Sequence, residues 1–206
     1  MSKKLIITFE GIESSGKSFH VKNVIKHLSN KKLKFIKLRE PGGSKNSEII
    51  RKMILSTKSK FHKKTDLLFY LAARNENINN IIKKNYKKKI ILIDRFSDST
   101  FAYQHYGMGL NFEIIKILND YVTEKIKTDF TFLHTVNSKN LKIRLSKRKT
   151  LNRYDKFKLS FYNKVQQGFL QIANKSKKKY MLIDSNNSIQ ENKKLILNKI
   201  NKLLNL

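Results

Sequence analysis

Eight residues near the N-terminus have the spacing of a loop that binds phosphate. Gly11, Gly16, Lys17 and Ser18 fit the pattern G-x-x-x-x-G-K-[ST]. Glycines at these places let several backbone N–H groups face one phosphate, and a following helix adds its positive dipole end. Lys17 could reach the terminal phosphates of a nucleoside triphosphate, and the Ser18 hydroxyl could bind Mg²⁺. The sequence therefore predicts a triphosphate site made of Gly11, Ile12, Glu13, Ser14, Ser15, Gly16, Lys17 and Ser18.

The segments on either side of this loop fit the same motif. Residues 5–9 form an apolar run typical of a buried strand, and residues 19–28 have the apolar spacing of a helix. A glycine turn that merely opens a helix is the alternative interpretation. The strand in front of the loop favours the phosphate-binding interpretation.

Four further apolar runs have the character of strands, and longer segments with helical periodicity separate them. These runs are residues 35–38, 90–93, 130–135 and 181–183. Strands that alternate with helices predict an α/β fold whose parallel sheet is covered on both faces. Because ligands gather at the carboxyl ends of such strands, we expect the polar motifs that follow them to form one site.

Two of these motifs carry arginine. Arg39 precedes Glu40-Pro41-Gly42-Gly43, a sequence that forces a tight turn and holds Arg39 near the strand tip. Asp94 and Arg95 end the run 90–93, where the carboxylate could help to hold Mg²⁺, often through water, and the guanidinium could bind phosphate. A surface turn with a chance arginine, and an ion pair that caps the strand, remain as alternatives.

Two helical regions could contact the ligand from other directions. Tyr70 and Arg74 lie four residues apart in a helix expected over residues 65–82, so they share a face that could stack on a base and bind its edge. Arginines and a lysine cluster farther along, where they could close over a triphosphate as a lid: Arg144, Arg148, Lys149 and Arg153. Plain packing and a solvated basic face are the respective alternatives.

Composition limits the class of protein. The 206 residues contain no cysteine, which excludes disulfides and thiolate metal sites, and no apolar stretch is long enough to cross a membrane. An intracellular, cytoplasmic enzyme of one domain, residues 1–206, is the simplest interpretation. The net charge of +30 would attract nucleic acid, but the lysines are spread along the whole chain. We interpret them as compositional drift towards Lys and Asn codons, and not as a nucleic-acid site.

Together these motifs make the chain resemble the bacterial thymidylate kinases, which are nucleoside monophosphate kinases. The resemblance runs from residue 5 to about residue 185 and rests on several pieces in the family's order: Phe9-Glu10-Gly11-Ile12-Glu13, Arg39-Glu40-Pro41-Gly42-Gly43, Leu68 to Arg74, Asp94-Arg95-Phe96, Ser99 to Gln104, and Asn152-Arg153-Tyr154-Asp155 ahead of Phe161-Tyr162. It implies a three-layer P-loop NTPase fold with a five-stranded parallel sheet and a lid at about residues 144–156. It also implies a homodimer and the transfer of a phosphoryl group from ATP to dTMP with Mg²⁺.

The resemblance also assigns roles to residues. It implies that Lys17, Arg95, Arg148 and Arg153 are catalytic, that Ser18 and Asp94 hold Mg²⁺, the latter through water, and that dTMP contacts Glu13, Arg39, Tyr70, Arg74, Arg95, Thr100, Tyr103 and Gln104. Phe69 is next to Tyr70, so the resemblance does not decide which of the two rings stacks on thymine. The phosphate loop has no basic residue between its glycines, which fits the subtype whose catalytic arginine comes from the lid.

The chain departs from the family pattern at three places. His105 and Met108 stand where glycine and a basic residue are usual, so one phosphate-side cation is lost or replaced by a nearby lysine. Asn152 stands where an acid often precedes the lid arginine, which predicts the loss of a lid ion pair. Two rival functions remain: a kinase for another nucleoside monophosphate, and a basic ATPase that binds nucleic acid.

Overall fold

The computed structural model describes residues 4–206. Its strands are β1 Ile6–Gly11, β2 Phe35–Arg39, β3 Ile90–Asp94, β4 Phe130–Thr135 and β5 Tyr180–Asp184. Its α-helices are α1 Lys17–Asn30, α2 Lys45–Leu55, α3 Lys63–Asn77, α4 Lys83–Asn85, α5 Ser97–Thr100, α6 Phe112–Thr123, α7 Ser138–Ser146, α8 Leu159–Asn174 and α9 Ile189–Leu204. Two π-helical segments, η1 Ile78–Ile82 and η2 Phe101–Gly107, and two 3₁₀ turns, η3 Arg153–Lys156 and η4 Lys177–Lys179, complete the elements.

The five strands form one parallel sheet in the order β2-β3-β1-β4-β5, which confirms the five runs and the α/β class predicted from the sequence. Asp94 of β3 lies opposite both Phe9 of β1 and Arg39 of β2. The ends of neighbouring strands therefore bring the phosphate loop, Arg39 and the Asp94-Arg95 pair to one edge of the sheet, as expected for a parallel α/β fold.

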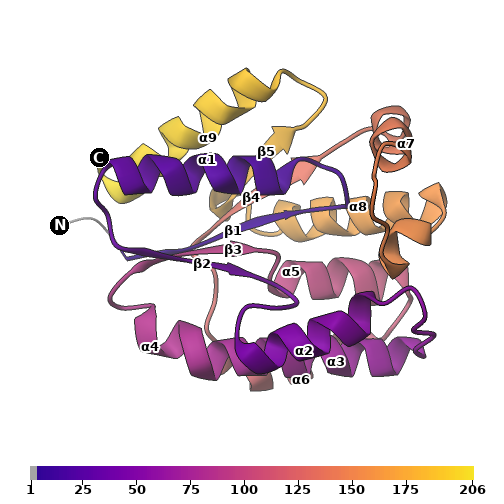
Figure 1. Ribbon diagram of the computed structural model, residues 1–206. Coiled ribbons are helices and arrows are strands. Elements are labelled where there is room, and N and C mark those ends of the chain that lie inside the picture. The colour runs from indigo at the N-terminus through magenta and orange to yellow at the C-terminus, as the bar shows by residue number, and fades with distance from the viewer. Residues whose placement is uncertain (1–3) are drawn as a thin grey trace.

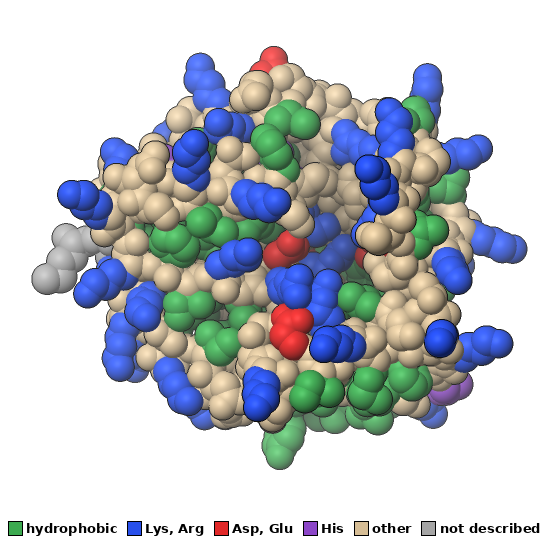
Figure 2. All heavy atoms as spheres, in the orientation of Figure 1, with side chains coloured by type: hydrophobic (Ala, Val, Ile, Leu, Met, Phe, Trp, Pro, Cys, Tyr) green, Lys and Arg blue, Asp and Glu red, His purple; other side chains and the backbone are tan. Residues whose placement is uncertain are grey.

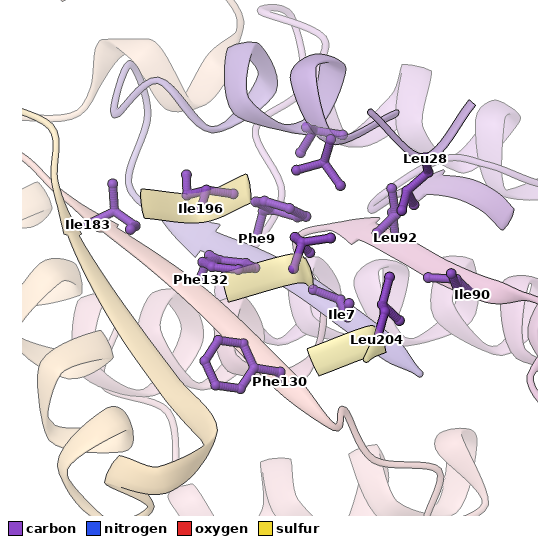
Figure 3. Close-up of a cluster of buried hydrophobic side chains, with 13 residues drawn as sticks. Ile7, Phe9, Leu28, Ile90, Leu92, Phe130, Phe132, Ile183, Ile196 and Leu204 are labelled. Carbon is purple, nitrogen blue, oxygen red and sulfur yellow. The ribbon is translucent and has the colours of Figure 1, made fainter. Parts of the chain in front are cut away.

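Helices α1 and α9 cover one face of the sheet (Figure 1). Every second strand residue points into the layer between the sheet and these two helices, because successive side chains of a strand face opposite sides. Figure 3 shows Phe9 and Phe132 together in this layer, with Ile196 beside them and Leu28 beside Leu92. The ring centroids of Phe9 and Phe132 are 5.2 Å apart. Burial of these rings and aliphatic chains fixes the helix that starts at the phosphate loop firmly onto the sheet.

Helices α3, α5, α6 and α8 lie on the opposite side of the sheet (Figure 1). Ile6, Ile91 and Ile93 of the strands pack there against Ile78 and Ile82. The expected helix over residues 65–82 is confirmed in extent, although its last five residues are π-helical. The wider turn of a π-helix is common near functional sites.

The surface agrees with the scattered charge of the sequence. Figure 2 shows Lys and Arg side chains spread over the whole visible face, with no single basic stripe. Near the middle of that face, acidic and basic side chains gather in a hollow. Among residues 4–206, no helix is long and apolar enough to cross a membrane.

Candidate active site

A cleft opens at the carboxyl edge of the sheet, and it brings most of the predicted site residues together (Figure 2). Among the predicted residues, those that line it are Glu13, Ser14, Ser15, Gly16, Lys17, Ser18, Arg39, Tyr70, Arg74, Asp94, Arg95, Thr100, Tyr103, Gln104, Arg144 and Arg148. Gly11, Ile12 and Arg153 do not line it. Segments up to about 130 residues apart in the chain therefore meet in one place.

The phosphate loop wraps around the Lys17 ammonium. Lys17 Nζ donates hydrogen bonds to the carbonyl oxygens of Gly11 and Ile12, at 2.8 and 2.7 Å, and to Ser15 Oγ at 3.3 Å. Gly16 has a φ of 85°, a left-handed conformation that glycine adopts at no steric cost, and α1 begins at the next residue. Burial, followed by the nearby cation of Arg95, lowers the pKa of Lys17 to about 7. An anion in the cleft would favour the charged form.

Ser18 and Asp94 lie together beside this loop. Ser18 Oγ donates a hydrogen bond of 3.0 Å to Asp94 Oδ2. Hydroxyl and carboxylate oxygens are suitable ligands for Mg²⁺, which usually keeps several waters and takes further oxygens from the phosphates of a substrate. Among residues 4–206, no group of three or more His, Cys, Asp or Glu side chains could hold a metal by itself. The pair therefore fits a magnesium ion shared with a nucleotide, and not one held in a closed protein cage.

Arg95 stands on a strained turn directly after β3. Its φ is 70°, in the left-handed region that non-glycine residues rarely adopt. Its guanidinium lies 5.1 Å from the centroid of the Tyr103 ring and donates to Glu13 Oε1 at 3.2 Å. Tyr103 Oη in turn donates to the other carboxylate oxygen of Glu13. The three side chains form one network across the cleft.

A buried carboxyl group supports this turn from below. Glu10 accepts hydrogen bonds from the Phe96 backbone N–H at 2.7 Å and from Ser99 Oγ at 2.6 Å. Ser99 Oγ also accepts from Arg95 Nη1 at 3.2 Å. Burial, followed by the nearby carboxyl of Asp98, raises the pKa of Glu10 to about 8. The turn that carries Arg95 is thus fixed by buried hydrogen bonds that no local sequence motif indicated.

Tyr70 and Gln104 add an aromatic and an amide side chain to the lining of the cleft. Tyr70 lies in the cleft, whereas the Phe69 ring packs on Phe61, with centroids 4.9 Å apart, outside it. Tyr70 is therefore the ring of the two that a ligand in the cleft can contact. Gln104 is 1% exposed, and its Nε2 has no hydrogen-bond partner among residues 4–206. A buried amide that lines a cleft in this way is free to bind a polar group of a ligand.

The lid residues have more ion pairs than the sequence predicted. Arg148 pairs with Asp155, and Arg153 pairs with Asp66 of α3, which also accepts a hydrogen bond of 2.7 Å from Tyr154 Oη. Asn152 caps η3 by accepting from the Tyr154 N–H. The predicted loss of a lid ion pair was therefore wrong, because acids elsewhere in the chain supply the partners. These pairs hold Arg148 at the cleft and Arg153 against α3.

Two residues of the cleft, Arg51 and Glu40, were missed or left without a role by the sequence reasoning, and Arg144 has contacts that it did not indicate. Arg51 of α2 lines the cleft and donates to the carbonyl oxygen of Pro41 at 2.5 Å. Glu40 is buried and pairs with Arg74 at 2.8 Å. Arg144 links the phosphate loop to the end of β5 by donating to the carbonyl oxygens of Ser14 and Ser185. The position of Arg51 in the helix after the Arg39 turn is the one sequence signal that could have found it.

The fold and the cleft together define a P-loop nucleotide kinase: a parallel sheet, a phosphate loop at the start of α1, a Ser18–Asp94 pair, and further arginines from the strand ends in the same cleft. Comparison with known families agrees with this class. The model of the thymidylate kinase family matches residues 9–196. The chain therefore belongs to the thymidylate kinase family.

Relatives and solved structures agree. The chain is 38% identical over 196 residues to a thymidylate kinase of Sulfurihydrogenibium sp. (strain YO3AOP1), covering 94% of this chain and 95% of the relative. It is 35% identical to a thymidylate kinase of Ligilactobacillus salivarius (strain UCC118), covering 90% and 91%. A crystal structure of thymidylate kinase from Ehrlichia chaffeensis superposes with a TM-score of 0.77 at 30% identity, covering 95% and 97%.

Proposed function

We propose that this chain transfers the γ-phosphoryl group of ATP to dTMP, giving dTDP and ADP for dTTP biosynthesis. The observation that carries the proposal is the shared cleft. Its lining includes the phosphate-loop Lys17 and the strand-end Arg95, together with Tyr70, Arg74 and Gln104. Phosphoryl transfer needs mainly positioning and cations around the moving group, and this arrangement supplies both. We further propose a cytoplasmic location for this cysteine-free chain.

On the acceptor side, Arg95 and Arg39 bind the phosphate of dTMP. The thymine ring stacks on Tyr70, and its polar edge meets Arg74, Thr100 and Gln104. Glu13 and Tyr103 contact the sugar, where Tyr103 leaves little room for a ribose 2′-hydroxyl. No general base is needed, because the acceptor phosphate is already an anion.

On the donor side, Lys17 and the amides of the phosphate loop bind the phosphates of ATP. Ser18, and Asp94 through water, would hold Mg²⁺, which offsets phosphate charge when bound. Arg148 extends from the lid to stabilise the charge that moves between the phosphates, and Arg153 holds the lid in place through Asp66. Closure of the lid would keep out water, which otherwise competes as acceptor.

A coupled assay of ADP release tests the function. We expect turnover with ATP and Mg²⁺ to be fastest with dTMP among dTMP, dUMP, dCMP, dGMP and dAMP. Comparable or faster turnover of another nucleotide would instead support a kinase of different specificity. Adding duplex DNA to the same assay should leave the rate unchanged, whereas tight, salt-sensitive binding with faster hydrolysis would point to the nucleic-acid alternative.

Arg148→Ala is expected to lower kcat by about 10²-fold or more while changing the KM for dTMP far less, because a lid arginine acts mainly in the transition state. Steady-state kinetics with dTMP varied at saturating ATP would measure the two effects. Lys149→Ala is the matched control, because the exposed neighbour carries the same charge and does not line the cleft. An unchanged kcat for Arg148→Ala would remove Arg148 from the catalytic group.

We also propose that the chain forms a homodimer, as the family resemblance implies. An apolar stripe on α6 supports this: Ile114, Ile117 and Tyr121 share one helical face and are 56, 65 and 80% exposed. Leu68 of α3, the helix that packs on α6, adds a further 57% exposed side chain. Burying this stripe against a second copy would remove it from water.

Ile117→Glu is expected to convert the dimer into a monomer, because it places a charge in the middle of the stripe. Light scattering coupled to size exclusion should give about twice the chain mass of 24.3 kDa for the unmodified chain and one chain mass for the variant. Leu195→Glu is the control, since Leu195 is 48% exposed on α9 and away from the stripe. A monomeric unmodified chain, or a dimeric Ile117→Glu variant, would contradict this assignment.

A further inference from the structure

Arg74 is an unusually well-fixed cation at the wall of the cleft. Its residue is 1% exposed, yet it lines the cleft. Its Nε donates to Glu40 Oε2 at 2.8 Å, and its guanidinium lies 5.1 Å from the centroid of the Phe96 ring. Such a buried ion pair is stable only if the other donors of the guanidinium are also satisfied.

Two further residues complete those contacts. Nη1 donates to Thr100 Oγ1 and to Asn119 Oδ1, both at 2.8 Å. A guanidinium has five N–H donors in a fixed plane, one on Nε and two on each terminal nitrogen. Glu40, Thr100 and Asn119 therefore account for the three donors on Nε and Nη1. The hydrogen bonds that Arg74 makes within residues 4–206 use Nε and Nη1, so Nη2 is the edge left for a ligand.

Asn119 is the member of this set that cannot touch a ligand in the cleft. It lies on the buried face of α6 with Ile115 and Thr123, is 6% exposed and does not line the cleft. Thr123 Oγ1 donates to the Asn119 backbone carbonyl at 2.8 Å, so it does not compete with Arg74 for the side-chain amide oxygen. Any effect of Asn119 on the ligand must therefore pass through the guanidinium.

We propose that Asn119 is a positioning residue that aims the Nη2 edge of Arg74 at the base of the acceptor nucleotide and so sets its selectivity. This inference rests on the proposed function. Nη2 can only donate hydrogen bonds, so it favours a base with a carbonyl oxygen at the contacted position. Thymine has a carbonyl there, at C4, whereas cytosine has an amino group that is itself a donor. A guanidinium free to tilt would lose part of this discrimination.

Asn119→Leu tests the inference, because leucine has a similar size, suits a helix and lacks the acceptor oxygen. We expect the KM for dTMP to rise about tenfold or more, the kcat/KM ratio of dTMP to dCMP to fall about tenfold, and the KM for ATP to stay within about twofold. Asn119→Asp keeps an acceptor oxygen and is expected to restore most of the ratio. Asn119→Ala applies the same test if the leucine variant does not fold.

Thr123→Val is the matched control on the same buried face. It removes a buried hydroxyl without touching Arg74, so it should lower the melting temperature and leave the dTMP to dCMP ratio unchanged. If Asn119→Leu and Asn119→Ala also keep that ratio and the KM for dTMP, Asn119 is a structural residue only and the inference is wrong. An unmodified chain that does not act on dTMP overturns the proposed function instead, and the inference with it.

Discussion

Replacing Lys17 with alanine is expected to lower kcat/KM for ATP by about 10³-fold, the scale found when one preorganised charged donor is removed from a transition state. The Lys17 ammonium is held at the centre of the phosphate loop by the carbonyl oxygens of Gly11 and Ile12. No other lysine lines the cleft among residues 4–206, so no neighbour could replace it. The ADP-release assay at varied ATP measures the loss.

The control for this prediction comes from the same helix. Lys22 of α1 is exposed and away from the cleft, so Lys22→Ala should keep nearly full activity. Both variants should keep the far-ultraviolet circular dichroism of the unmodified chain, because the core between α1, α9 and the sheet is untouched. More than a tenth of normal turnover in Lys17→Ala would contradict the role assigned to the loop lysine.

Proton uptake by Lys17 on ATP binding is a second test of the role of this lysine. Its pKa is lowered to about 7 by burial and then by Arg95, so the free protein loses this proton at a lower pH than an exposed lysine would. Triphosphate anions stabilise the ammonium and raise the pKa, so ATP binding at pH 8 should take up a proton. Calorimetry in two buffers of different ionisation enthalpy would detect the uptake, which should be absent in Lys17→Ala.

The second large effect is expected from Arg95→Ala, which should lower kcat/KM for dTMP by about 10³-fold and leave the KM for ATP nearly unchanged. The substitution removes the guanidinium that stacks on Tyr103 and pairs with Glu13. It therefore removes a charge that would bind the acceptor phosphate and releases Glu13 and Tyr103, the two side chains that we propose contact the sugar. Kinetics with each substrate varied in turn, and calorimetric titration with dTMP, would separate the two sites.

Ser99→Ala tests how much of this effect comes from the position of Arg95. Its hydroxyl accepts from Arg95 Nη1 and donates to Glu10, so the variant keeps the charge of Arg95 but loosens its position. We expect kcat/KM for dTMP to fall by about ten times the experimental error, which is far less than the fall in Arg95→Ala. The position of the guanidinium contributes less to dTMP binding than its charge does. If Arg95→Ala binds dTMP with normal affinity, the acceptor phosphate lies elsewhere, and Arg39 and Arg51 become the candidates.

The sequence determined the architecture and most of the site through local patterns. Five apolar runs separated by helical segments were sufficient for the parallel sheet, because strand and helix periodicity are properties of neighbouring residues. Each polar motif follows a strand directly, and parallel strands end at one edge. The sequence alone therefore predicts that Gly16, Lys17, Asp94 and Arg95 lie together.

The tertiary structure decided which of two adjacent residues faces the cleft and which distant partners hold the arginines. Tyr70 lies in the cleft and Phe69 does not, because Phe69 finds Phe61 to pack against. Asp66 and Arg153 form an ion pair although they are 87 residues apart in the chain, and Asn119 accepts a hydrogen bond from Arg74, which lies 45 residues before it. Such pairs depend on how α3, α6 and the lid pack together. Local periodicity predicts which face of a helix is buried. Only the packing of the elements determines which buried polar groups form hydrogen bonds with one another.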